Sequence, residues 1–129
     1  MPTGNQNYKS TNLMSIGVPA AEADAIADSF QSATAALGNT LAAAATSNAD
    51  IVHLGSVASN NNGFALRVGT GFKKRQTVIN GTSTAALIYP PTVTGFINNQ
   101  AAGTSFSLAS GLAATFASLD ANGLQYWKL

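Results

Sequence analysis

The chain contains no cysteine and very few charged residues, and both shortages exclude kinds of protein. Without cysteine, neither disulfide bonds nor thiolate metal sites can form. Charged side chains make up 9% of the 129 residues, against about 25% in an ordinary soluble domain. Apolar residues, at 46%, are close to average, so small and uncharged polar residues replace the missing charges.

The shortage of charge has a consequence for association. Because the net charge is only +1, copies of the chain repel one another weakly. We therefore expect a surface that is covered by sister subunits or by a larger assembly. A monomer that is kept soluble by uncharged polar groups is the alternative.

Long apolar runs are also missing. No stretch approaches the ~20 consecutive apolar residues that a membrane-spanning helix requires. Residues 1–12 are polar and lack the apolar stretch of a secretory signal. The expectation is a protein made in a cytoplasm, without a membrane partner.

The residues that carry chemistry are scarce too. The single histidine, His53, follows Asp50 by three positions, but no G-x-S-x-G motif accompanies them. The five carboxylates form no evident acid–base pair, and a lone histidine does not make a zinc site. We therefore expect neither an enzyme nor a bound metal or cofactor.

The residues Lys73-Lys74-Arg75 form the only run of charge. Nucleic-acid binding would need more cations over a wider face, so no nucleic-acid partner is expected. Such a run is either solvated or matched to an acidic patch on a neighbouring subunit.

Residues 1–30 are expected to form an N-terminal arm and a short helix. Residues 1–12 have no periodic apolar pattern. Pro19 suits the first turn of a helix that would end at Phe30, where Ile26 and Phe30 share one face. A helix of about eleven residues is marginal in isolation, so it needs a surface to lie against.

Residues 31–129 are expected to form a β domain, although alanine, serine and threonine leave the assignment of residues 31–48 open. From residue 51 onward, short β-branched and aromatic runs recur every eight to twelve residues between turn signals, which is typical of a sandwich or barrel. The expected strands are 51–57, 64–68, 75–79, 85–89, 95–98, 105–108, 113–119 and 124–129. Asn80-Gly81 and Asn122-Gly123 predict hairpin turns.

The chain contains, in this order, 76–82 (QTVINGT), 87–91 (LIYPP), 97–99 (INN), 113–116 (AATF) and Trp127. Together these segments resemble a module of tailed-bacteriophage virion proteins. The resemblance implies a small antiparallel β-sandwich or barrel, jelly-roll-like and trimeric, of the kind found in head decoration proteins, head fibres and tail fibres. It also favours a strand near 40–45 and a turn at 47–50. The Thr92-Val93-Thr94-Gly95 segment departs from it, because a Gly-Gly turn is common there.

A second, shorter resemblance rests on the pattern Leu13, Ile16, Gly17, Val18, Pro19, Ala20 and Ala23, which is similar to a virion-docking peptide of such proteins. The docking candidates are Leu13, Ile16, Val18, Pro19, Ile26 and Phe30. The subunit-interface candidates are Tyr89, Trp127 and Leu129. A helix that packs on its own β domain is the alternative to docking.

The function that the resemblance implies is a trimeric capsid decoration, cement or head-fibre protein on the virion surface. Its partners would be the major capsid protein, or another virion protein, and two further copies of itself. The alternative is a tail- or fibre-associated module that contacts host polysaccharide. For that role Tyr89, Tyr126 and the three asparagines 60–62 are available.

Overall fold

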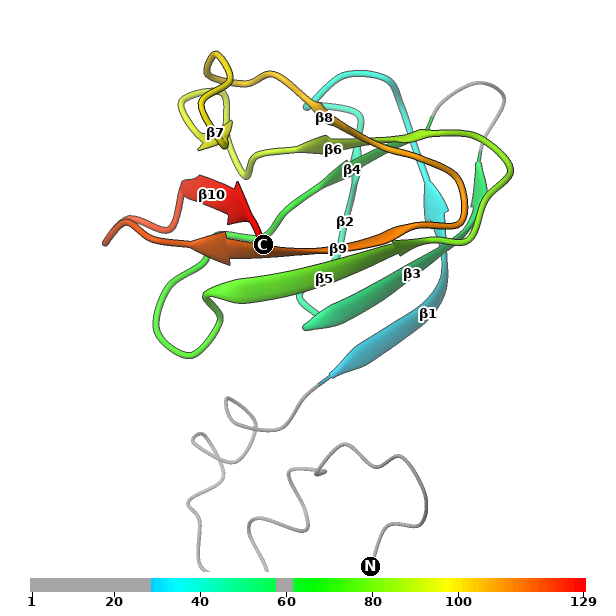
Figure 1. Cartoon of the computed structure of the whole chain (residues 1–129), viewed down its shortest axis with the longest axis horizontal. Helices are drawn as coiled ribbons and strands as arrows, with labels where there is room; N and C mark the ends of the chain where they lie inside the picture. Colours follow the sequence, from blue (N-terminus) through cyan, green and yellow to red (C-terminus); the bar gives the residue numbers. More distant parts are fainter. Residues whose placement is uncertain (1–28, 58–61) are drawn as a thin grey trace, which may run out of the picture.

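The computed structural model describes residues 29–57 and 62–129, which form ten strands in two sheets and contain no helix (Figure 1). The six-stranded sheet has the order β1-β3-β5-β9-β10-β7, and the four-stranded sheet the order β2-β4-β6-β8. The strands are β1 (Phe30–Ala36), β2 (Ala45–Thr46), β3 (Ile51–Val57), β4 (Gly63–Ala65), β5 (Arg75–Asn80), β6 (Ala86–Tyr89), β7 (Phe96–Ile97), β8 (Phe106–Leu108), β9 (Ala113–Ser118) and β10 (Gln125–Lys128). The mainly β, two-layer architecture is therefore confirmed.

Successive strands from β1 to β6 alternate between the two sheets. As a result β1, β3 and β5 are parallel neighbours in one sheet, and β2, β4 and β6 are parallel neighbours in the other. Residues 30, 51 and 77 stand in register across the first sheet, and residues 45, 64 and 88 across the second. The chain thus winds as a coil that adds one strand to each sheet per turn.

The last strands close one side of this coil. β8 lies antiparallel to β6, β9 lies antiparallel to β5, and β10 lies antiparallel to β9. The short strand β7 pairs in parallel with β10 at the edge of the larger sheet. At the opposite edges of the two sheets lie β1 and β2.

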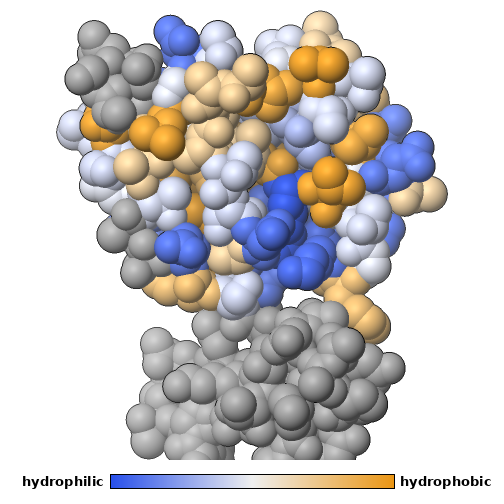
Figure 2. Space-filling view, turned by 180° about the vertical axis from the view of Figure 1, so that it is seen from behind, coloured by the Kyte–Doolittle hydropathy of each residue, from blue (hydrophilic) through white to orange (hydrophobic). Residues whose placement is uncertain are grey.

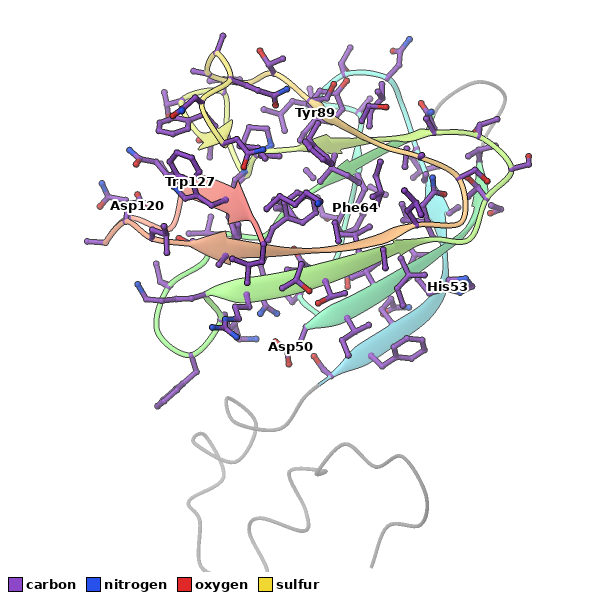
Figure 3. All side chains as sticks on the ribbon, viewed as in Figure 1. Asp50, His53, Phe64, Tyr89, Asp120 and Trp127 are labelled. Atoms are coloured by element: carbon purple, nitrogen blue, oxygen red, sulfur yellow. The ribbon has the colours of Figure 1, made fainter. Side chains whose placement is uncertain are left out.

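The core lies between the two sheets, where Phe64 is visible in Figure 3. Alternation along β3 explains how the strands contribute, because Val52 and Leu54 are fully buried while their neighbours are not. Phe106 and Phe116 meet edge to face across the core, with ring centroids 5.7 Å apart. The largest fully buried side chains are Tyr126, Phe64, Phe116, Leu54, Ile88 and Ile97.

Two expectations about strand pairing were wrong. The sheets are not antiparallel throughout, since five of their eight strand pairs are parallel. Asn80-Gly81 does not form a hairpin, because β5 and β6 belong to different sheets. Gly81 lacks the positive φ that a type I′ turn needs, and its N–H continues the parallel pairing by donating to the Leu54 carbonyl at 2.9 Å.

Two expectations about the first half of the domain were also wrong. Residues 41–43 form a turn, and the short strand Ala45–Thr46 shares only Ala45 with the expected strand near 40–45. Phe30 opens strand β1, so the expected helix does not include it. The arm and the rest of that helix lie outside the described residues. The strand at 51–57 and the hairpin at Asn122-Gly123, between antiparallel β9 and β10, are confirmed.

Candidate self-association and docking surface

The outer face of the six-stranded sheet is built by strand register. Residues 30, 51, 77 and 115 are aligned across β1, β3, β5 and β9. Leu129 extends this row, since its N–H donates to the Thr115 carbonyl at 2.8 Å. The inward partners in the next row, such as Val52, Val78 and Ala114, are buried. Because side chains alternate along a strand, the first row points away from the core.

Two further rows complete this surface. One row contains residues 53, 79 and 113, and the other contains residues 75, 117 and 127. We call the combined surface the outer face, and it consists of Phe30, Ile51, His53, Arg75, Thr77, Ile79, Ala113, Thr115, Ala117, Trp127 and Leu129. It contains no Asp or Glu side chain, and Arg75 is its only permanently charged side chain. Most of it is therefore apolar or β-branched.

The outer face has few polar groups that need hydrogen bonds from water. Phe30 and Leu129 are 52% and 63% exposed, although both are large apolar side chains. The hydroxyls of Thr77 and Thr115 are 2.8 Å apart and satisfy each other. The four-stranded sheet packs against the opposite side, and within residues 29–57 and 62–129 no element lies over this one. Burying such a face against a partner leaves few polar groups unpaired.

The structure places two of the three interface candidates on the outer face. Trp127 is half-buried there beside Ala117, and Leu129 is exposed at the end of the chain. Phe30, a docking candidate, lies on the same face. Tyr89 is elsewhere: it is 7% exposed, and its hydroxyl donates to the Asn39 carbonyl at 2.6 Å. The other docking candidates, Leu13, Ile16, Val18, Pro19 and Ile26, lie outside the described residues.

A buried polar cluster joins the two sheets at one end, and the sequence did not predict it. The Arg67 guanidinium donates to an Asp50 carboxylate oxygen at 2.6 Å and to the carbonyls of Asn48, Lys73 and Arg75. Alternation along the expected strand 64–68 predicts Arg67 outside and Val68 inside. Both predictions are wrong, because four inward acceptors allow Arg67 to be buried, while Val68 is 47% exposed.

Two amide side chains on the inner face of β5 complete the connections between the sheets. The Gln76 side chain accepts a hydrogen bond from the backbone N–H of Arg67 and donates to the carbonyls of Ser47 and Ala49. At the other end of the strand, Asn80 donates to the carbonyls of Thr84 and Leu108. Both amides are fully buried. The signal in the sequence was a pair of amides on the side of the strand that carries the buried Val78.

A groove of about 480 Å³ adjoins the polar cluster. It is lined by Thr46, Ser47, Asn48, Leu66, Arg67, Val68 and Pro91. The guanidinium of Arg67 reaches the groove with four of its five N–H groups already donated inward. It has little capacity left to bind an anion there.

The residues that could carry catalysis are not brought together. His53 points away from the interior, and its ring lies so close to Gly81 that a Cβ there would overlap it (Figure 3). Both carboxylate oxygens of Asp50 are occupied by Arg67 and Ser29. In the part of the chain that the structure describes, no hydrogen bond joins His53 to a serine or a carboxylate, and no cluster of three metal-ligating residues occurs. The same part contains no helix long and apolar enough to cross a membrane.

Among the residues that the structure describes, two titratable groups have shifted pKa values. Burial raises the pKa of Tyr126 to about 12, and its hydroxyl donates to the Arg67 carbonyl at 2.6 Å. For Asp120, partial burial acts to raise the pKa, but hydrogen bonds from the N–H groups of Gln125 and Leu124 hold it below its ordinary value. Both groups stabilise strand β10 and its hairpin, so their role is structural.

Comparisons with protein-family models, with curated proteins and with solved structures find no match for this chain.

Proposed function

We propose that this chain is a structural virion protein that binds the outer capsid surface as a trimer, as a decoration, cement or head-fibre protein. The observation that carries the proposal is the outer face, a surface without Asp or Glu side chains that exposes Phe30 and Leu129. The resemblance of segments 76–82 and 87–91 to phage virion modules supplies the location. The capsid shell, or another virion protein, is the proposed partner.

The energetics of the outer face support association. Fully burying a Leu, Ile or Phe side chain contributes about 1.5–3 kcal/mol. Association itself costs about 4–15 kcal/mol in lost freedom of motion. Five side chains of this size are available, namely Phe30, Ile51, Ile79, Trp127 and Leu129. Burying them together offsets a cost in the lower part of that range.

A threefold assembly also places a geometric demand on the surface. A cyclic trimer is heterologous, so the outer face of one copy would contact a different surface of the next. Exposed apolar side chains away from the outer face, such as Val93 at 72% and Leu119 at 69%, can supply that second surface. Three linked copies then convert three weak capsid contacts into one firm attachment through effective concentration.

The solution mass of the full-length chain, measured by light scattering after size exclusion, tests the self-association. We expect a trimer, and we expect Trp127→Glu/Leu129→Glu to give a folded monomer because two buried charges would lack partners. Leu37→Glu, at an exposed apolar position that is assigned to neither contact, is the matched control and should leave the trimer intact. A wild-type chain that remains a monomer at high concentration would contradict the proposal.

The capsid contact needs a separate experiment. Residues 1–28 are removed and β1 is kept intact, and co-sedimentation with capsids is measured. We expect the truncated trimer to lose binding. If it sediments with capsids as well as the full chain, the docking role of the N-terminal segment is wrong.

The alternative, a host-binding module that contacts polysaccharide, has less support from the described residues. Tyr89 and Tyr126 are buried and donate their hydroxyls internally, so neither offers a ring for a sugar. The side chain of Asn62 donates to the Ala85 carbonyl, while Asn60 and Asn61 lie outside the described residues. A glycan array that detects specific binding by the assembled protein would favour this alternative.

A further inference from the structure

Cationic side chains are concentrated in one loop of the described domain. Lys73, Lys74 and Arg75 are all exposed, and the described residues include only two carboxylates, Asp50 and Asp120. Asp50 takes part in the one salt bridge found among them, with buried Arg67. Seen from behind, hydrophilic side chains of the domain lie in the lower middle of the view and in a second area at the right edge (Figure 2). None of the three cationic side chains of the loop forms a salt bridge within the described residues.

The backbone of this loop is fixed from within. The carbonyls of Lys73 and Arg75 accept hydrogen bonds from the Arg67 guanidinium at 3.3 and 2.6 Å. The carbonyl of Lys74 accepts one from the Ser118 N–H at 2.6 Å. Because all three carbonyls are held by the domain, the three cationic side chains extend from an anchored backbone. We call residues 72–75 the basic loop.

A tight turn precedes the three cations. The Lys73 N–H donates to the Thr70 carbonyl at 3.0 Å, and Gly71 has a φ of +60°, which favours glycine. The turn leaves Phe72 69% exposed beside the cations. An exposed aromatic ring next to three cations is suited to an acidic peptide that also has apolar side chains.

The sequence contains such a peptide. Three of the five carboxylates of the chain, Glu22, Asp24 and Asp28, fall within residues 22–28, together with Ile26. Ser29 follows directly, and its N–H donates to Asp50 at 2.9 Å, while Asp50 also binds Arg67. The acidic stretch is therefore joined to the domain at Ser29. The Asp50 side chain links Ser29 to Arg67, which anchors the basic loop.

We propose that the basic loop binds the acidic stretch 22–28 of its own chain. Opposite charges on one chain attract each other most strongly at low salt, where the screening length is long, about 30 Å at 0.01 M. The contact fixes the direction in which the N-terminal segment leaves the domain. It does not depend on the proposed virion role, and its test uses no capsid.

The absence of cysteine allows a clean test. A nitroxide is attached to Ala23→Cys in the full-length chain, and amide NMR signals of residues 70–75 are recorded. We expect strong broadening of these signals at about 20 mM salt and its loss near 1 M salt, where the screening length is about 3 Å. Lys73→Glu/Lys74→Glu is expected to abolish the broadening. Lys128→Glu, which changes another exposed cation, is expected to retain it.

Two further samples decide the remaining points. Adding Glu22→Lys/Asp24→Lys to the Lys73→Glu/Lys74→Glu variant should restore the broadening, because the positive and negative charges of the two segments are then exchanged. A mixture of isotope-labelled chains without nitroxide and unlabelled chains with it should show none. Broadening in the mixture would assign the contact to a neighbouring copy and overturn the proposal. Absence of broadening in the wild-type loop, with core signals intact, would also overturn it.

Discussion

The outer sides of the two sheets differ in what covers them. On the four-stranded sheet, Tyr89 is 7% exposed because the chain at Asn39 lies against its hydroxyl, and Gly63 pairs through its backbone with Leu37 and Gly38. On the six-stranded sheet, Trp127 is half-buried and Leu129 is 63% exposed. The domain therefore covers one sheet with its own connection, while the described residues leave the other sheet open.

This difference separates residues that the sequence treats alike. Tyr89 and Trp127 are both aromatic residues close to the end of a strand, and both were predicted to form a subunit interface. Of these two residues, only Tyr89 is covered by another segment of the described chain, at Asn39, whose carbonyl accepts its hydrogen bond. Their substitution should accordingly affect different properties, Tyr89 the stability of the fold and Trp127 the association of copies.

The largest effect is expected from Tyr89→Ala. Removing this buried ring should lower the free energy of unfolding by about 3–5 kcal/mol, because it leaves a cavity and an unpaired carbonyl at Asn39. Leu129→Ala is the matched change on the open sheet and should stay within about 0.5 kcal/mol for the monomer. Urea denaturation at low protein concentration measures both values. Similar losses for the two variants would refute the difference between the sheets.

The sequence predicted strand positions better than strand partners. Alternation of buried and exposed residues marks 51–57 and 75–79 whichever partner the strand has. A coil that alternates between two sheets and a series of hairpins can have the same spacing of turns. Asn80-Gly81 shows the ambiguity: the dipeptide is typical of a hairpin, but the Asn80 side chain binds Thr84 and Leu108 and directs the chain to the other sheet.

The candidate site was predictable only in part. Trp127 and Leu129 could be chosen because apolar residues alternate in the last strand. The covering of Tyr89 could not, since it comes from a stretch whose alanines and threonines give no periodic pattern. The cluster of Asp50, Arg67 and Gln76 depends on contacts between segments distant in sequence, which no local pattern encodes.

A second substitution tests how the two sheets are held together. Asp50→Ala removes the carboxylate that pairs with Arg67, whose side chain is 3% exposed. An unpaired buried guanidinium should lower the free energy of unfolding by about 3 kcal/mol, at the low end for buried pairs because Asp50 itself is 22% exposed. Denaturant unfolding measures the loss. Lys128→Ala is the control, since it removes an exposed charge that forms no salt bridge among the described residues, and an equal loss there would contradict the argument.

The smallest effect concerns the two sides of strand β10, where Tyr126 points into the core and Trp127 points out. The pKa of Tyr126 is raised from 10.0 to about 12 because burial disfavours the phenolate. The contribution of neutral Tyr126 to the free energy of unfolding is complete below pH 10. It is lost as the pH rises towards 12, because Tyr126 ionises first in the unfolded chain. The expected loss is roughly 2 kcal/mol. Denaturant unfolding between pH 8 and pH 12 should show this decline in the wild type and a flatter profile in Tyr126→Phe. An equal decline in both proteins would mean that groups other than Tyr126 control stability at high pH.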